Sequence, residues 1–107
     1  MNILFVCSKN QWRSPTAEEI YKNSPVYHVR SAGTEAGARI KATAKIIVWA
    51  DIIFVMEKKH KERLIQKFPD EARAADIVVL NIEDHYKFMD EELVAMIQTG
   101  VAPYLMD

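Results

Sequence analysis

The chain has 107 residues and one cysteine, which predicts a single domain over residues 1–107 and excludes both a disulfide framework and an all-cysteine metal site within one chain. Half of the residues are hydrophobic, 27% are charged and the formal net charge is −1, so the composition gives no indication of binding to nucleic acid or to a membrane surface. No apolar run approaches membrane-spanning length and no leader pattern precedes the first apolar run, so we expect a cytoplasmic protein.

The first predicted elements are a strand, a tight loop and a helix. Residues 3–6, Ile-Leu-Phe-Val, form a short apolar run that is typical of a buried strand. Ser14 is expected to be the N-cap of the helix and Pro15 its first residue, because apolar residues then recur at helical spacing. The loop between strand and helix contains Cys7 and Arg13, with five residues between them.

Cys7 and Arg13 have a chemical use in such a loop. Successive backbone N–H groups can converge on a dianion, and the helix N-terminus adds positive potential that also favours the nucleophilic thiolate. The planar guanidinium of Arg13 can bind two phosphate oxygens and stabilise charge in a transition state. The arrangement therefore predicts a site where Cys7 attacks a bound phosphoryl group and forms a phosphocysteine.

The competing interpretation is that Cys7 is only a small buried hydrophobic residue, which is the commonest role of a single cysteine at the end of a strand. Cys and Arg at this spacing are a weak signal by themselves. The preceding strand and the following Ser-Pro at the start of a helix favour the catalytic loop.

The remaining elements are predicted to alternate between strand and helix. Strands are expected over residues 26–32, 52–56 and 77–80, the second of them apolar throughout and hence buried on both faces. Helices are expected from Arg39 onward, over residues 58–68, and after an N-cap at Asp90. Trp49 is interpreted as packing at the core or helix edge, and His60 receives no role because it has no ligand-spaced partner.

This alternation predicts an α/β fold with a four-stranded parallel sheet flanked by helices as a three-layer sandwich. In such sheets ligands bind at the carboxyl ends of the strands. The loop with Cys7 and the loop with Asp84 both follow strands, so we expect them to meet at that edge.

Residues 5–18, from Phe-Val-Cys to Arg-Ser-Pro-Thr-Ala-Glu, resemble the signature of the low-molecular-weight protein tyrosine phosphatases and their small bacterial relatives. Residues 31–34, Ser-Ala-Gly-Thr, resemble the same family, as does the Asp, apolar run, Met-Glu pattern of residues 51–57. The resemblance implies a flavodoxin-like fold and a reaction without a metal or cofactor. It also implies phosphate binding by the loop residues Ser8, Lys9, Asn10, Gln11, Trp12, Arg13 and Ser14, with loop support from Asn10, Ser14 and Ser31.

Several positions depart from the family pattern. Lys9 stands where the family usually has Gly, and Trp12 stands where it has a second Cys. Ala36 stands where a His commonly braces the loop, so we expect one bracing hydrogen bond to be missing. The region after residue 37 is shorter than in larger relatives and lacks a segment that walls the active site. Thioredoxin-coupled arsenate reductases share the loop, but they need further cysteines that this chain does not have.

The resemblance also supplies a candidate general acid. The family uses the Asp of an Asp-Pro-Tyr element after the last strand, and Asp84-His85-Tyr86 resembles that element with His85 in place of Pro. A carboxylic acid there donates a proton to the leaving oxygen. Asp84 is preferred, with Glu83 and His85 as alternatives, and Asp84 could also be turn chemistry alone. Tyr86 and Trp12 are candidates for stacking on an aromatic substrate, although Trp12 could instead pack beneath the loop.

The sequence therefore predicts a phosphomonoesterase, and most specifically a bacterial protein tyrosine phosphatase that acts on phosphotyrosine proteins or on small aryl or alkyl phosphates, with inorganic phosphate as an inhibitor. One alternative is a phosphate- or phosphotyrosine-binding module with little turnover, which the departures at Lys9 and Ala36 favour. Another is a phosphocysteine phosphocarrier resembling the IIB proteins of sugar transport systems, against which Arg13-Ser14 argues.

Overall fold

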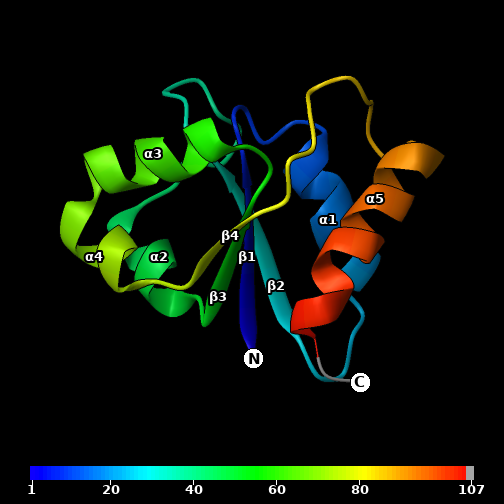
Figure 1. Ribbon diagram of the computed structural model, residues 1–107, viewed down its shortest axis with the longest axis horizontal. Coiled ribbons are helices and arrows are strands. Elements are labelled where there is room, and N and C mark those ends of the chain that lie inside the picture. Colours follow the sequence, from blue (N-terminus) through cyan, green and yellow to red (C-terminus); the bar gives the residue numbers. More distant parts are fainter. Residues whose placement is uncertain (106–107) are drawn as a thin grey trace.

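The computed structural model describes residues 1–105, which fold around a four-stranded parallel sheet with the strand order β2-β1-β3-β4 (Figure 1). The predicted fold class is therefore confirmed. The register sets Phe5 opposite Ser31 on one side and Phe54 on the other, so that β1 is central. The strands are β1 (Asn2–Cys7), β2 (His28–Gly33), β3 (Ile52–Val55) and β4 (Ile77–Val79).

Helices cover both faces of the sheet and complete three layers (Figure 1). One face is covered by α1 (Arg13–Tyr21) and α5 (Glu91–Val101), and the other by α2 (Ala44–Trp49), α3 (Lys58–Lys67) and α4 (Pro69–Ala74). A 3₁₀ turn (Ala102–Tyr104) follows α5. None of the helices in residues 1–105 combines the length and the apolar character needed to cross a membrane.

The alternation of side chains along β1 divides the core into two clusters. Ile3, Phe5 and Cys7 are buried on the side of α1 and α5, where Leu93 and Ile97 also pack. The intervening β1 residues, Leu4 and Val6, are buried on the opposite side, in the cluster that contains residues of α2, α3 and α4. Cys7 thus ends β1 on the α1 side, directly below the loop that begins α1.

The prediction of a helix from Arg39 is wrong, because α2 begins only at Ala44 with Thr43 as its N-cap. The preceding residues run beside the end of β2 instead: Gly33 N donates to Ile40 O at 2.7 Å, and Ala42 N donates to Gly33 O at 2.9 Å. These backbone bonds hold residues 40–42 extended, and the Thr43 side chain then accepts a hydrogen bond from Ile46 N.

Elsewhere the predicted elements are found with shifted ends. The last helix begins as expected after Asp90, whose carboxylate accepts from the N–H groups of Glu92 and Leu93. Helix α3 is one residue shorter than predicted, and α4, which begins at Pro69, was not predicted. Trp49 packs against the core cluster as expected, with the Arg30 guanidinium 5.1 Å from its ring centroid.

Candidate active site after the first strand

The loop between β1 and α1 lies at the carboxyl edge of the sheet, where parallel α/β sheets bind ligands (Figure 1). Asn10 at its centre is completely buried and has a left-handed backbone with a φ of 55°. Asn adopts this conformation more readily than other side-chain-bearing residues, because its short amide can bond locally. Gly33 at the end of β2 packs against the loop so closely that a Cβ added there would collide with Ser8 O and Asn10 N.

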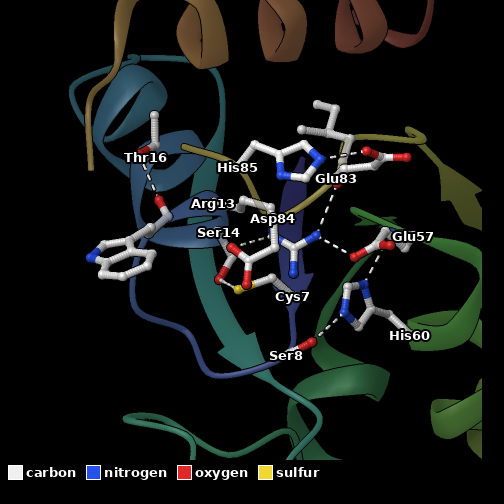
Figure 2. A network of polar contacts seen from close by, with 12 residues as sticks. Cys7, Ser8, Arg13, Ser14, Thr16, Glu57, His60, Glu83, Asp84 and His85 are labelled. Atoms are coloured by element: carbon white, nitrogen blue, oxygen red, sulfur yellow. Dashed lines mark hydrogen bonds and ion pairs between the residues drawn. The ribbon is translucent and has the colours of Figure 1, made fainter. Parts of the chain in front are cut away.

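Ser14 lies beside the candidate nucleophile rather than capping the helix. Helix α1 begins at Arg13 with Trp12 as its N-cap, so the prediction that Ser14 is the cap is wrong. The Ser14 Oγ is instead 3.0 Å from Cys7 Sγ (Figure 2). It also accepts a hydrogen bond from Asn10 Nδ2 at 2.8 Å. The Ser14 hydroxyl still has its own proton, which has two acceptors within reach, Ala32 O at 3.4 Å and the Cys7 sulfur at 3.0 Å, and a negatively charged thiolate is the stronger acceptor.

The guanidinium of Arg13 is almost completely buried and is held by three groups. Its Nη1 donates to Glu57 Oε1 at 2.5 Å and to Ile82 O at 2.9 Å, and its Nε is 3.6 Å from Asp84 Oδ1 (Figure 2). Burial raises the pKa of Glu57, but the hydrogen bond and charge of Arg13 outweigh it and hold that pKa below its ordinary value. Arg13 is therefore fixed in position by an ionised partner.

His60 has a structural role that sequence reasoning missed. It is 1% exposed, and both of its ring nitrogens have partners: Nδ1 accepts from Glu57 N at 3.0 Å, and Nε2 is 2.8 Å from Ser8 Oγ (Figure 2). Because Nδ1 is an acceptor, Nε2 carries the proton and donates it to Ser8. Burial and the charge of Arg13 lower the pKa of His60 to about 4, which keeps the ring neutral. The available signal was the spacing of Glu57 and His60 as N-cap and third residue of α3.

The structure brings Asp84 to the same pocket as Cys7 and Arg13, although it is far from them in sequence. The pocket has a volume of about 20 Å³, enough for one small group, and is lined by Cys7, Lys9, Gln11, Trp12, Arg13 and Asp84. The two alternative acids do not line it. Glu83 Oε2 and His85 Nε2 form an exposed pair at 2.6 Å (Figure 2).

Other predicted site residues have different positions. Trp12 is 42% exposed at the pocket, so it does not pack beneath the loop, whereas Tyr86 packs against the core and does not line the pocket. The Ser8 hydroxyl is bonded to His60, and Ser8 is not among the residues that line the pocket. Ser31 Oγ donates to Glu18 Oε1 at 2.5 Å and so ties β2 to α1, and its support of the loop stays a prediction.

Comparison with known proteins relates the chain to one phosphatase family. Residues 2–48, which include the whole loop, match the low molecular weight phosphotyrosine protein phosphatase family. Wzb of Vibrio vulnificus, solved in complex with benzylphosphonate, superposes with a TM-score of 0.77 at 26% identity over 96% of this chain and 95% of its own. The first part of the chain therefore resembles this family in sequence, and the chain shares the fold of Wzb over nearly its whole length.

Relatives with two different substrate names share this fold. The tyrosine phosphatase Wzb of Escherichia coli K30, solved with phosphate, has a TM-score of 0.77 at 21% identity over 96% of this chain and 94% of its own. The YwlE arginine phosphatase of Geobacillus stearothermophilus has a TM-score of 0.69 at 22% identity over 99% and 98%. A protein-arginine-phosphatase of the same species is 29% identical over a 92-residue alignment covering 64% of this chain and 62% of that relative, so less than two thirds of its length is matched.

The departures from the family pattern are visible in the loop. Among residues 1–105, the buried Asn10 Oδ1 has no hydrogen-bond partner, as expected if a bracing His is missing, and Ala36 is exposed. Lys9 and Trp12, which replace Gly and Cys, are both exposed and both line the pocket. Within the described residues no group of three or more His, Cys, Asp or Glu side chains is arranged to hold a metal ion.

Proposed function

We propose that the protein is a metal-independent phosphatase that acts through a phosphocysteine on Cys7. The observation that carries the proposal is the shared pocket: the thiol of Cys7, the guanidinium of Arg13 and the carboxyl group of Asp84 line one small cavity. A nucleophile, a fixed cation and a proton donor around one site are the three groups that cleavage of a phosphate ester requires.

In the first step the Cys7 sulfur attacks phosphorus, the sulfur–phosphorus bond forms and the bond to the leaving atom breaks; this atom is oxygen in a phosphate ester and a guanidinium nitrogen in phosphoarginine. Arg13 and the loop amides from Ser8 to Ser14, including those of Lys9, Asn10, Gln11 and Trp12, bind the phosphoryl oxygens. Asp84 gives its proton to that leaving atom. In the second step water attacks phosphorus, the Asp84 carboxylate takes up its proton, and the sulfur–phosphorus bond breaks to release phosphate and the thiolate. Asn10 and Ser14 position the sulfur, as the bond from Ser14 Oγ supports.

For the substrate we propose a phosphorylated protein side chain, with phosphotyrosine first. The exposed ring of Trp12 at the pocket supports an aromatic leaving group, which can stack on it. Phosphoarginine is the second candidate, because a relative at 29% identity is a protein-arginine-phosphatase. In both cases the small pocket accepts the phosphoryl group, and the rest of the side chain lies above Trp12 and Gln11.

The test is hydrolysis of an aryl phosphate and of free phosphoarginine in the presence of a chelator at mildly acidic pH. Cys7→Ser is expected to abolish turnover, and Asp84→Asn to slow it by about 10²–10⁴-fold on the substrate with the poorer leaving group. Glu83→Gln is the matched control, since Glu83 is an exposed neighbour outside the pocket. The ratio of the two wild-type kcat/KM values decides between phosphotyrosine and phosphoarginine.

Two outcomes contradict the proposal. A wild-type protein that binds phosphate but hydrolyses neither substrate is a phosphate-recognition module. A protein that forms phosphocysteine and transfers the group to a partner, with no release to water, is a phosphocarrier. Turnover that survives Asp84→Asn but not Cys7→Ser keeps the nucleophile and moves the acid to Glu83 or His85.

A further inference from the structure

The segment that carries Asp84 connects β4 to α5 without regular secondary structure, and we call residues 81–90 the acid segment. It has a left-handed residue near each end, Asn81 with a φ of 59° and Met89 with a φ of 62°. Asn adopts this backbone readily, but Met rarely does, so the conformation of Met89 persists only where surrounding contacts hold it.

The acid segment is fixed at its first end through Ile82. This residue is buried in the core, its N–H donates to Met56 O at 2.8 Å, and its carbonyl accepts from Arg13 Nη1 at 2.9 Å. The first anchor thus joins the segment both to the end of β3 and to the phosphate-binding Arg13.

The second end is fixed through Thr16, in the first turn of α1. Thr16 is completely buried, and its Oγ1 donates to Trp12 O at 2.6 Å while it accepts from Met89 N at 2.9 Å. A hydroxyl has one proton and two lone pairs, so one Thr16 side chain satisfies both bonds at once. It joins Trp12, the residue before α1, to Met89, which lies 73 positions from Thr16 in the chain.

Asp84 lies between these two anchors and has little else to hold it. Its side chain is 56% exposed, and its contact with Arg13 is a 3.6 Å ion pair. The position of its carboxyl group over Cys7 therefore depends on where the two ends of the acid segment are fixed. Figure 2 shows Asp84 above Cys7. It also shows Thr16 and His60 on opposite sides of the loop.

We propose that Thr16 is a positioning residue that holds the acid segment over the loop between β1 and α1, so that Asp84 can protonate the leaving group. The proposal rests on the proposed function for its catalytic consequence, but the anchoring itself does not require turnover. Removal of the hydroxyl should release Met89, whereas Trp12 O keeps the hydrogen bond from Thr16 N at 3.0 Å.

The first experiment measures hydrogen exchange of the Met89 amide by NMR in wild type, Thr16→Val and Thr16→Ser. Thr16→Val removes the acceptor at nearly constant shape, and Thr16→Ser keeps it. Exchange at Met89 is expected to accelerate at least about tenfold in Thr16→Val and to stay near wild type in Thr16→Ser, since an amide loses protection with its hydrogen bond. Thr99→Val on the exposed surface of α5 is the matched control. Unchanged Met89 exchange in Thr16→Val overturns the proposal.

The second experiment compares phenyl phosphate with 2,4-dinitrophenyl phosphate, whose leaving group departs without a proton. A displaced acid should lower kcat/KM, which reports the first step alone, by about tenfold or more on the phenyl ester and by less than about twofold on the dinitrophenyl ester, because only the former needs general-acid help. An equal loss on both esters overturns the positioning role. If wild type hydrolyses neither ester, the proposed function fails, and the exchange result still decides whether Thr16 anchors the segment.

Discussion

His60 provides the sharpest test of the network around the loop, through the dependence of stability on pH. Its ring is buried and neutral, with a pKa lowered from 6.5 to about 4. The unfolded chain therefore binds a proton at His60 at a higher pH than the folded protein does. The stability from the neutral ring is fully present above about pH 6.5 and is lost as the pH falls toward 4.

The size of the effect follows from the shift. A difference of this size between the folded and unfolded pKa of His60 corresponds to about 3 kcal/mol, at 1.36 kcal/mol per pH unit. Burial of the ring is the largest cause of the lowered pKa, and the charged groups that also act on it are Arg13, Glu57, Lys59 and Asp84. Protonation would also replace the acceptor at Nδ1 by a donor facing Glu57 N, which breaks that bond.

The assay is urea unfolding of wild type and His60→Gln at closely spaced pH values from 7 to 4. Between these limits wild type should lose about 3 kcal/mol more of its free energy of unfolding than His60→Gln does. At neutral pH the variant should be less stable by about 1–3 kcal/mol, because Ser8 Oγ and Glu57 N lose a partner. His28→Gln, at the exposed first residue of β2, serves as the control, and the pH dependence of its stability should follow that of wild type. Equal pH slopes for wild type and His60→Gln would refute the reasoning.

Two further substitutions test the loop from other sides. A Cβ added at Gly33 would lie 2.6 Å from Ser8 O and 3.0 Å from Asn10 N. Gly33→Ala should therefore displace the loop, weaken phosphate binding measured by calorimetry, and destabilise the fold by about 1–3 kcal/mol. Gly37→Ala is the control and should have none of these effects, because a Cβ added at Gly37 has no atom within 4 Å. Ser14→Ala removes the hydroxyl 3.0 Å from Cys7 Sγ and should reduce kcat by about tenfold or more in a steady-state assay, and an unchanged kcat would contradict the contact's role. It should also lower the melting temperature, because the buried Asn10 Nδ2 loses its acceptor.

The sequence alone determined the features that depend on local pattern. The apolar run before Cys7 and the alternation of strands and helices were enough to predict the parallel sheet, because the periodicity of apolar side chains indicates which residues are buried. The spacing of Cys7 and Arg13 was enough to predict the loop, because Cys7 ends β1 and Arg13 begins α1 on either side of it. Resemblance to a family pointed to Asp84, which the structure places in the same pocket.

The tertiary structure decided which distant groups meet the loop. His60, Glu57 and the carbonyl of Ile82 reach Ser8 and Arg13 across 44 to 69 residues of chain, and no local pattern fixes such contacts. Ser14 was mistaken for a helix cap because capping residues and nucleophile partners have the same hydroxyl, and only the fold shows where it points. The same holds for the helix expected from Arg39, where hydrogen bonds to Gly33 prevailed over helical spacing.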